Sequence, residues 1–207
     1  MLSYRTIEPN TLELLNKLFQ VPILSDMRLV GGTALALQYG HRKSVDLDFF
    51  GSLDCEVDEL EDELKSLGNV CRHKATKTIR IYQINGVKVD FVDYRRYAWI
   101  DECICEDNIR LASPKDIAAM KINAIEGRGS KKDFIDIYYL LKNFSINELL
   151  DFYKNKYPEY SYFRALMSLT YFDDADAQPM PYMFGTILWE QIKQEIVKAV
   201  EKISPIN

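Results

Sequence analysis

The sequence lacks any run of apolar residues that reaches the roughly 20 positions needed to cross a bilayer. Residues 1–10 also lack the basic segment and apolar stretch of a secretion signal. Neither an internal repeat nor a low-complexity tract is present. We therefore expect a cytoplasmic protein that does not insert into a membrane.

Cysteine and histidine are scarce. The four cysteines, at positions 55, 71, 103 and 105, form no C-x-x-C pair, and His41 and His73 are the only histidines. This pattern argues against a structural zinc site, which needs four closely spaced ligands. Without a secretion signal, the cysteines should be reduced thiols.

An excess of basic residues is missing as well. The formal net charge is −5, which argues against a protein that coats nucleic acid with its whole surface. Hydrophobic residues make up 47% of the 207 positions, enough for a sizeable core. The length allows one domain with a helical extension or two small domains.

The hydrophobic pattern changes near Ser113 and predicts two regions. Residues 1–112 read as a mixed α/β core and residues 113–207 as a helical domain. In the first region we expect helices at 11–20, 33–39 and 57–67 and strands at 27–30, 45–50, 78–84 and 87–94. In the second we expect helices at 113–126, 130–142, 146–156, 160–169 and 187–203, with 173–181 as a linker or excursion.

Asn85-Gly86 is the sharpest local signal. It separates two strand-like runs, and both residues tolerate the positive φ of a two-residue hairpin turn. Such a turn fixes the register: it pairs Ile84 with Val87 and sets Asp90 opposite Ile81.

Gly31-Gly32-Thr33 stands between a strand-like run and a helix. Free backbone N–H groups at such a helix start can hold a phosphate, and Thr33 adds a hydroxyl. The alternative is a tight turn without a ligand.

Asp46 and Asp48 lie two apart in Val45-Asp46-Leu47-Asp48-Phe49-Phe50. In a strand they would share one face while residues 45, 47 and 49 enter the core. Two adjacent carboxylates repel each other, and Mg²⁺ relieves this while also binding phosphate oxygens. The alternative is a solvated strand face.

Asp90 is a third acid within an apolar strand, in Val87-Lys88-Val89-Asp90-Phe91-Val92. Alone it would be read as a solvent-facing hairpin residue. With Asp46, Asp48 and the Gly-Gly turn it suggests a metal-assisted phosphoryl-transfer site.

These motifs resemble the AbiEii-type nucleotidyltransferases, which are related to toxins of abortive-infection and MenT-type toxin–antitoxin systems. The resemblance rests on residues 31–37 and 41–50 and continues through 121–141 and 171–175. It implies an α/β (α+β) core like that of DNA polymerase β, with NTP and Mg²⁺ (or Mn²⁺) as substrate and cofactor. Many members of the superfamily carry Gly-Ser where this chain has Gly32-Thr33.

The resemblance also implies roles for individual residues. Asp46 and Asp48 match the metal-binding pair, Asp90 the third carboxylate, and Lys121, Asp133 and Asp136 the later helical motifs. From the residues alone, Lys121 is either a phosphate ligand or a surface lysine. Asp133 is either a capping residue or part of the site, and Asp136 positions Lys121, contacts the nucleotide or pairs with Lys132.

Basic residues flank these motifs and, if they converge, form a rim suited to a triphosphate and an RNA acceptor. We expect His41 and Arg42 to take part in nucleotide binding. The alternative is scattered solvated charge. The other members are Lys43, Arg72, His73, Lys74, Lys77, Arg80, Arg95, Arg96, Arg128, Lys131 and Lys132.

The leading hypothesis is a metal-dependent nucleotidyltransferase acting on a tRNA, protein or small-molecule acceptor, as the toxin of a toxin–antitoxin or abortive-infection system. In it, the backbone at residues 31–33 holds the phosphates, Asp46 and Asp48 hold Mg²⁺, and Asp90 binds a second metal or serves as a base. A second hypothesis is a nucleotide-binding module without turnover that works through an antitoxin-like partner. A metal-dependent phosphohydrolase ranks last, because it rests on the Asp-x-Asp alone.

Overall fold

The computed structural model describes residues 1–203. Its internal contacts divide the chain into two compact units. The first comprises residues 1–98 and 102–112, and the second comprises residues 99–101 and the chain from Ser113 onward. Each unit is described by itself.

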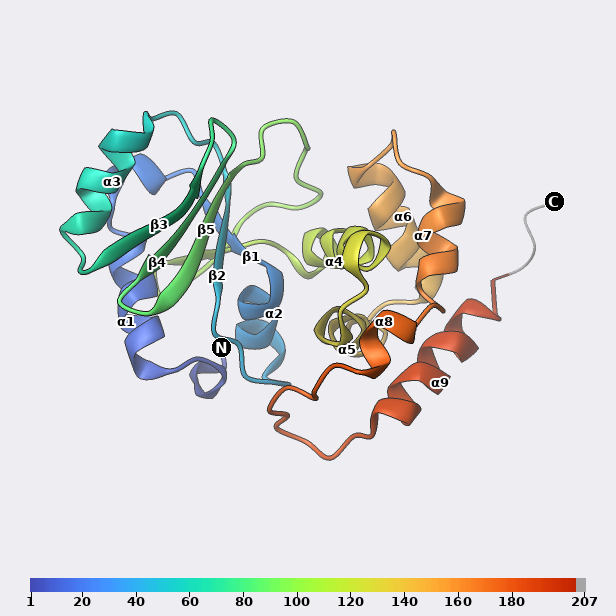
Figure 1. Ribbon diagram of the computed structural model, residues 1–207. Coiled ribbons are helices and arrows are strands. Elements are labelled where there is room, and N and C mark those ends of the chain that lie inside the picture. Colours follow the sequence, from blue (N-terminus) through green and yellow to red (C-terminus); the bar gives the residue numbers. More distant parts are fainter. Residues whose placement is uncertain (204–207) are drawn as a thin grey trace. The chain divides into compact units, whose positions relative to one another are not determined.

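The first unit is built on a seven-stranded mixed sheet in the order β3-β4-β5-β2-β1-β7-β6 (Figure 1). The β2–β5 and β1–β7 pairs are parallel, and the other pairs are antiparallel. This confirms the predicted α/β fold class. The strands are β1 (Arg28–Val30), β2 (Leu47–Gly51), β3 (Val70–Ala75), β4 (Ile79–Ile84), β5 (Val87–Asp93), β6 (Ile104–Glu106) and β7 (Ile109–Leu111).

Helices cover the sheet of this unit. They are α1 (Pro9–Leu18), α2 (Gly31–Tyr39) and α3 (Val57–Lys65), with short 3₁₀ turns at Tyr4–Thr6 and Pro22–Leu24. Phe49 of β2 meets Phe19 at the end of α1 with ring centroids 5.2 Å apart, and also stacks on Phe91 of β5. These buried rings form the core on one face of the sheet. Figure 1 shows α1 and α3 on one side of the strands and α2 on the other.

The hairpin from β4 to β5 has the predicted register. Ile84 pairs with Val87, and Ile81 pairs with Asp90. Asn85 and Gly86 have φ angles of 50° and 87°, as a two-residue turn with two left-handed residues requires.

Strand β2 begins later than predicted. It starts at Leu47, so Val45 and Asp46 precede it. Leu47 and Phe49 are fully buried as expected, but Val45 is 52% exposed. The prediction that Val45 enters the core is therefore wrong, because that residue lies outside the ladder that fixes side-chain alternation.

The second unit is helical. Its helices are α4 (Pro114–Arg128), α5 (Lys131–Leu140), α6 (Ile146–Lys156), α7 (Tyr162–Ser168), α8 (Asp173–Asp176) and α9 (Trp189–Val200). Ser113 caps α4 by accepting a hydrogen bond from the Asp116 amide, and Ser145 with Glu148 forms a capping box on α6. Both starts follow the capping signals in the sequence.

Two predictions for this unit are wrong. Helix α4 continues through Gly127 and ends at Arg128, with Gly129 in the left-handed conformation at φ 51°. Gly129, and not Gly127, therefore supplies the C-terminal cap. The expected linker 173–181 contains the short helix α8, whose Ala175 is buried.

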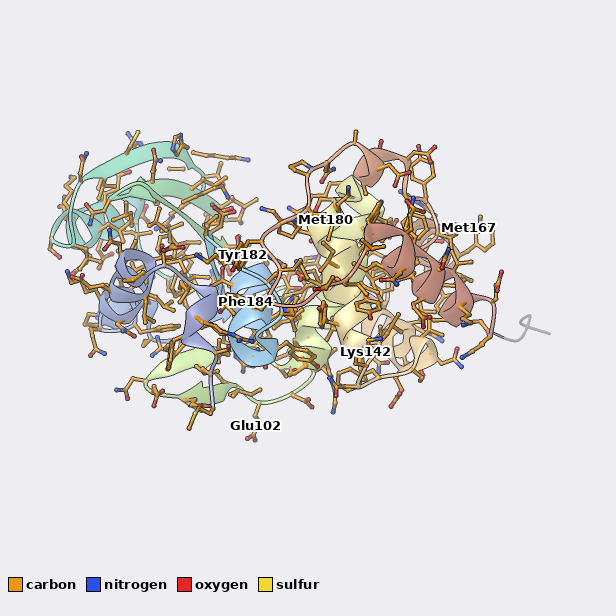
Figure 2. The ribbon with its side chains drawn as sticks, turned by 90° about the horizontal axis from the view of Figure 1, so that it is seen from below. Glu102, Lys142, Met167, Met180, Tyr182 and Phe184 are labelled. Carbon is orange, nitrogen blue, oxygen red and sulfur yellow. The ribbon has the colours of Figure 1, made fainter. Side chains whose placement is uncertain are left out.

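Aromatic residues pack inside the helical unit, where Phe134 contacts Phe172 and Trp189. Some apolar side chains remain outside: Met167 of α7 is 54% exposed and points away from its helix (Figure 2). Within residues 1–203, no helix combines the length and the apolar character required to span a bilayer.

Candidate active site

The turn from β1 into α2 places two glycines against polar side chains. Gly31 has φ +68°, and a Cβ built on it would lie 2.6 Å from Oδ2 of Asp48. A Cβ built on Gly32 would clash with the Arg42 guanidinium. The positive φ of Gly31 favours glycine there, and both glycines let the backbone at the start of α2 approach Asp48 and Arg42 closely.

The Thr33 hydroxyl fixes the segment that precedes β2. Thr33 is 1% exposed, and its Oγ1 lies within hydrogen-bond distance of the Asp46 carbonyl and, at 2.9 Å, of Ser44 Oγ. A hydroxyl carries one proton, so Thr33 donates to the carbonyl and accepts from Ser44. Through these bonds Thr33 positions the backbone of Asp46.

Asp48 and Asp90 are neighbours across the parallel β2–β5 pair. They are direct register partners, and Val30, which precedes Gly31, is the antiparallel partner of Asp48 on its other side. Paired residues project from the same face of a sheet. Because Phe49 and Phe91 face the core, Asp48 and Asp90 share the opposite face. The sheet thus aligns both carboxylates with the Gly-Gly turn.

Asp90 has one paired oxygen and one unpaired oxygen. Lys88 Nζ donates to Oδ2 at 2.6 Å, while Oδ1 is buried and has no hydrogen-bond partner. The Asp90 side chain is 19% exposed. A buried carboxylate oxygen without a donor is costly, so this atom has free capacity to bind a cation.

The third predicted carboxylate does not complete a cluster. Asp46 is partly exposed and lies before β2. Throughout residues 1–203, no three histidine, cysteine, aspartate or glutamate side chains come together in a group that could hold a metal ion. The structure thus aligns Asp48 with Asp90 and leaves Asp46 on the adjoining segment.

The predicted basic rim is only partly present. His41, Arg42 and Arg80 are 3%, 2% and 2% exposed, and Lys131 is 5% exposed. The alternative of scattered solvated charge is therefore wrong for these four side chains. Arg42 instead lies against Gly32 and donates to the Lys43 carbonyl at 3.0 Å, so its charge stays beside the turn.

In the helical unit, Lys121 joins α4 to α5. Its ammonium lies 2.9 Å from Asp133 and 2.6 Å from Asp136. Lys121 is 5% exposed and Asp136 is fully buried. The alternative that Lys121 is a surface lysine is therefore wrong. The alternative that Asp136 simply pairs with Lys132 is also wrong, because Asp136 pairs with Lys121.

The pKa of Asp133 is lowered by its neighbours in this cluster. Burial favours its neutral form, but Lys121, Arg128 and the Ser130 hydroxyl together lower the pKa of Asp133 to about 2. Arg128 Nε lies 3.0 Å from Asp133, and Ser130 Oγ donates to it at 2.6 Å. The carboxylate is ionised at neutral pH, which keeps its partner Lys121 in a charge-balanced cluster.

Sequence reasoning missed two residues of the site, Ser44 and Lys88. Ser44 donates to Thr33, and Lys88 pairs with Asp90. The sequence did contain a signal for Lys88. Residues two apart on a strand share a face, so Lys88 is expected to lie beside Asp90. Ser44 had none, because its contact depends on how the chain folds back from α2.

The comparisons with known proteins agree with this geometry. Residues 13–204 match the family described as "Nucleotidyl transferase AbiEii toxin, Type IV TA system". The chain belongs to the AbiEii nucleotidyltransferase toxin family. One relative, the protein aq_aa25 of Aquifex aeolicus (strain VF5), is 33% identical over 96% of this chain and 98% of its own.

Solved structures show the same fold for this AbiEii family member. JHP933 from Helicobacter pylori is similar with a TM-score of 0.57, at 20% identity, over 93% of this chain and 89% of that chain. The antibiotic-resistance factor ANT(2'')-Ia is similar with a TM-score of 0.53, at 15% identity, over 68% of this chain and 88% of that chain. These likenesses confirm the nucleotidyltransferase fold expected from the sequence.

Proposed function

We propose that this AbiEii family member transfers a nucleotide from an NTP to an acceptor, at a site formed by the start of α2 and the carboxylates of Asp48 and Asp90. One observation carries the proposal: the register places Asp48 directly between Asp90 and the strand that leads into the Gly-Gly turn. An anion-binding turn and two acids on one sheet face are the parts that nucleotidyl transfer requires.

The donor set fits a hard divalent cation. It consists of carboxylate oxygens, which Mg²⁺ and Mn²⁺ prefer, and one of them, Oδ1 of Asp90, is buried without a partner. We propose that Asp48 and Asp90 hold the cation and that Asp46 joins them from the segment before β2. When bound, the cation neutralises charge on the phosphates.

The chain itself would bind and orient the nucleotide. The N–H groups of residues 31–33 point from the start of α2 toward a phosphate, and the buried Arg42 adds positive charge beside Gly32. His41 precedes Arg42 in the same buried segment. If the cation is held by Asp48 and Asp46 instead, Oδ1 of Asp90 would be the base that accepts the proton of the attacking hydroxyl.

Lys121, Asp133 and Asp136 are proposed as the contribution of the helical unit. Together with Arg128 these residues form a charge-balanced cluster that joins α4 to α5. The support for Lys121 and Asp136 as members of the site is the resemblance to the family's later helical motifs, and we keep them as proposed members on that basis.

The proposed acceptor is an RNA or a protein, and the proposed setting is a cytoplasmic toxin–antitoxin system with an antitoxin-like partner. The family description names a type IV system, which supports both the toxin role and the partner.

One observation favours a second candidate, a nucleotide-binding module without turnover. Within residues 1–203, Asp46, Asp48 and Asp90 do not form a three-ligand metal group. A module of this kind would bind NTP at the Gly-Gly turn and release no pyrophosphate.

A transfer assay tests the first candidate. The purified protein is incubated with Mg²⁺, each α-labelled NTP in turn, and pooled tRNA or cell lysate. We expect label on a macromolecule, and a loss of more than about 100-fold in Asp48→Asn, because that change removes a direct cation ligand. Asp58→Asn is the matched control, since Asp58 is exposed on α3, away from the site.

Full activity in Asp48→Asn would contradict the assignment of the site. Absence of label in the wild type, with NTP binding detected by calorimetry, would favour the module without turnover. Release of phosphate instead of pyrophosphate would indicate hydrolysis.

A further inference from the structure

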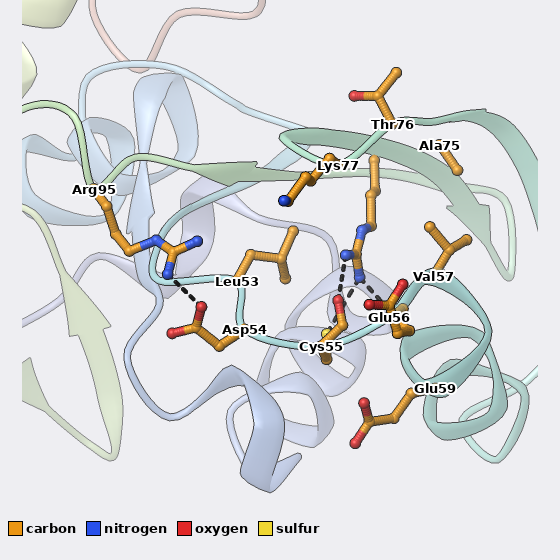
Figure 3. A pocket seen from close by; sticks show the side chains of 11 residues that line it. Leu53, Asp54, Cys55, Glu56, Val57, Glu59, Ala75, Thr76, Lys77 and Arg95 are labelled. Atoms are coloured by element: carbon orange, nitrogen blue, oxygen red, sulfur yellow. Dashed lines mark hydrogen bonds and ion pairs between the residues drawn. The ribbon is translucent and has the colours of Figure 1, made fainter.

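A hollow lies in the α/β unit, beyond the C-terminal end of β2. Its volume is about 750 Å³, and its walls are the loop after β2, the start of α3 and the turn between β3 and β4 (Figure 3). Asp48 is the second residue of β2, and the loop that lines the hollow begins after Gly51. Strand residues advance about 3.3 Å each, so the hollow is separate from the proposed nucleotide site.

Arg80 of β4 lines this hollow and carries a buried charge. It is 2% exposed. Its guanidinium donates to the carbonyls of Cys55 and Glu56, the latter at 3.2 Å, and to the Cys55 thiol at 3.2 Å. Its Nε is buried and has no hydrogen-bond partner.

The partners of Arg80 are all neutral. Carbonyl and thiol groups satisfy some of its N–H groups. Its charge helps Arg95 to lower the pKa of Asp93, but no direct ion pair joins Arg80 to a carboxylate of the described chain. Buried charges in proteins are normally paired. A guanidinium of this kind attracts an anion, and its planar fork suits the two oxygens of a carboxylate or phosphate.

The remaining charges of the hollow are of both signs. Arg95 pairs with Asp54 (Figure 3) and also with Asp93, so it adds no positive charge. Lys77 lines the hollow from the turn before β4 and is exposed, without an ion pair in the described chain. Two acids, Glu56 and Glu59, also line it, but both are exposed at the start of α3 and remain hydrated.

We propose that this hollow binds an oxyanion, the phosphate or carboxylate group of a small molecule, between Arg80 and Lys77. Arg80 supplies a fixed, desolvated charge and Lys77 supplies a mobile one that can close on the ligand. The site does not depend on the proposed nucleotidyl transfer, since none of its residues belongs to the site at Asp48 and Asp90.

The reactivity of the Cys55 thiol reports whether an anion occupies the hollow. Its thiol lines the hollow, is partly exposed and accepts a hydrogen bond from Arg80. The rate of its alkylation by iodoacetamide is measured by peptide mass spectrometry in the full chain, with inorganic phosphate or acetate titrated against chloride at constant ionic strength. We expect a threefold slower rate at about twice the dissociation constant, because a third of the sites remain empty there.

Matched variants localise the effect. Lys77→Gln should weaken protection by phosphate at least about tenfold, whereas Lys74→Gln, which changes an exposed lysine of β3 outside the hollow, should leave it unchanged. Arg80→Gln should abolish protection. Asp48→Asn should retain it, and the exposed Cys71 and Cys105 should react at constant rates throughout.

Protection by phosphate alone would identify a phosphate ligand, protection by acetate alone a carboxylate ligand, and protection by both the shared oxyanion chemistry. No protection by either anion at 100 mM would overturn the proposal. Equal protection in the wild type, Lys77→Gln and Arg80→Gln would overturn it too, because the anion would then act elsewhere.

Discussion

At the scale of single residues, the cluster around Lys121 shows how one buried cation organises its surroundings. Lys121 lies between two aspartates of α5, and only 5% of it is exposed. Asp133 in turn accepts bonds from Arg128 and Ser130. Each charge is stable in the interior only while the others are present.

Replacing Lys121 should therefore destabilise the helical unit strongly. We expect Lys121→Met to lower the free energy of unfolding by about 3–5 kcal/mol, because two buried carboxylates lose their shared cation. Lys132→Met is the control: Lys132 is exposed on α5, the helix that carries both aspartates, and its loss should change stability by less than about 0.5 kcal/mol. Urea titration of both variants measures the difference, and equal midpoints would contradict the expectation.

The low pKa of Asp133 predicts that the free energy of unfolding depends on pH in the acidic range. Its pKa is about 2 in the folded protein, against 3.8 for the unperturbed carboxyl. A lowered folded-state pKa gives stability that is fully present above pH 4 and is lost as the pH falls toward 2. We expect this group to contribute about 2 kcal/mol across that window. The contribution is the difference between the pH profiles of the wild type and Asp133→Asn; parallel profiles would refute it.

At the scale of elements, Gly86 and Gly127 differ in the backbone conformation that each adopts. Gly86 completes the β4–β5 turn with φ +87°, whereas Gly127 lies inside α4 without positive φ. A Cβ at either position would meet no atom within 4 Å. Backbone conformation alone therefore decides the outcome of a substitution.

The same substitution should change stability in opposite directions at these sites. Gly86→Ala should destabilise by about 1–2 kcal/mol, because a Cβ is unfavourable in the left-handed region. Gly127→Ala should stabilise by about 0.5–1 kcal/mol, since alanine is the better helix former. Thermal melts followed by circular dichroism report both shifts, and a common sign would show that other contacts dominate.

Element prediction worked where the local signal was strong. The hairpin register followed from Asn85-Gly86, and α6 lies at the predicted residues 146–156. The strands β3, β6 and β7 were missed. For β6 and β7 the sequence did contain a turn signal, the pair Asp107-Asn108. Both residues have positive φ, at 52° and 63°, and form a two-residue turn between three-residue strands. Such short strands depend on pairing with the sheet, which periodicity does not show.

At the scale of the whole molecule, the chain passes between the two units at three points: between residues 98 and 99, 101 and 102, and 112 and 113. Asp116 of α4 secures the short segment 99–101 to the helical unit. Its carboxylate accepts from the amides of Ile100 and Asp101 at 2.9 and 3.2 Å. Lys156 of α6 compensates it at 2.7 Å, and both side chains are fully buried.

Removing Lys156 should release this segment. In Lys156→Met, Asp116 keeps a buried charge without a cation, and we expect the amides of Ile100 and Asp101 to exchange with deuterium at least about tenfold faster. Lys154→Met serves as the control, since Lys154 is exposed on the same helix. Exchange measured by mass spectrometry on the peptide spanning 99–101 reports the change, and equal rates in both variants would rule out the anchoring role of the pair.

The sequence by itself determined the fold class, the hairpin register and the candidate acids at positions 46, 48 and 90, because turn chemistry and strand alternation are local properties. Only the tertiary structure decided what these residues contact. It made Asp48 the register partner of Asp90, turned the Thr33 hydroxyl toward Asp46, buried Arg42 against Gly32 and paired Lys121 with two aspartates. Such contacts join residues far apart in the chain, and burial and pairing of charge follow from packing rather than from spacing.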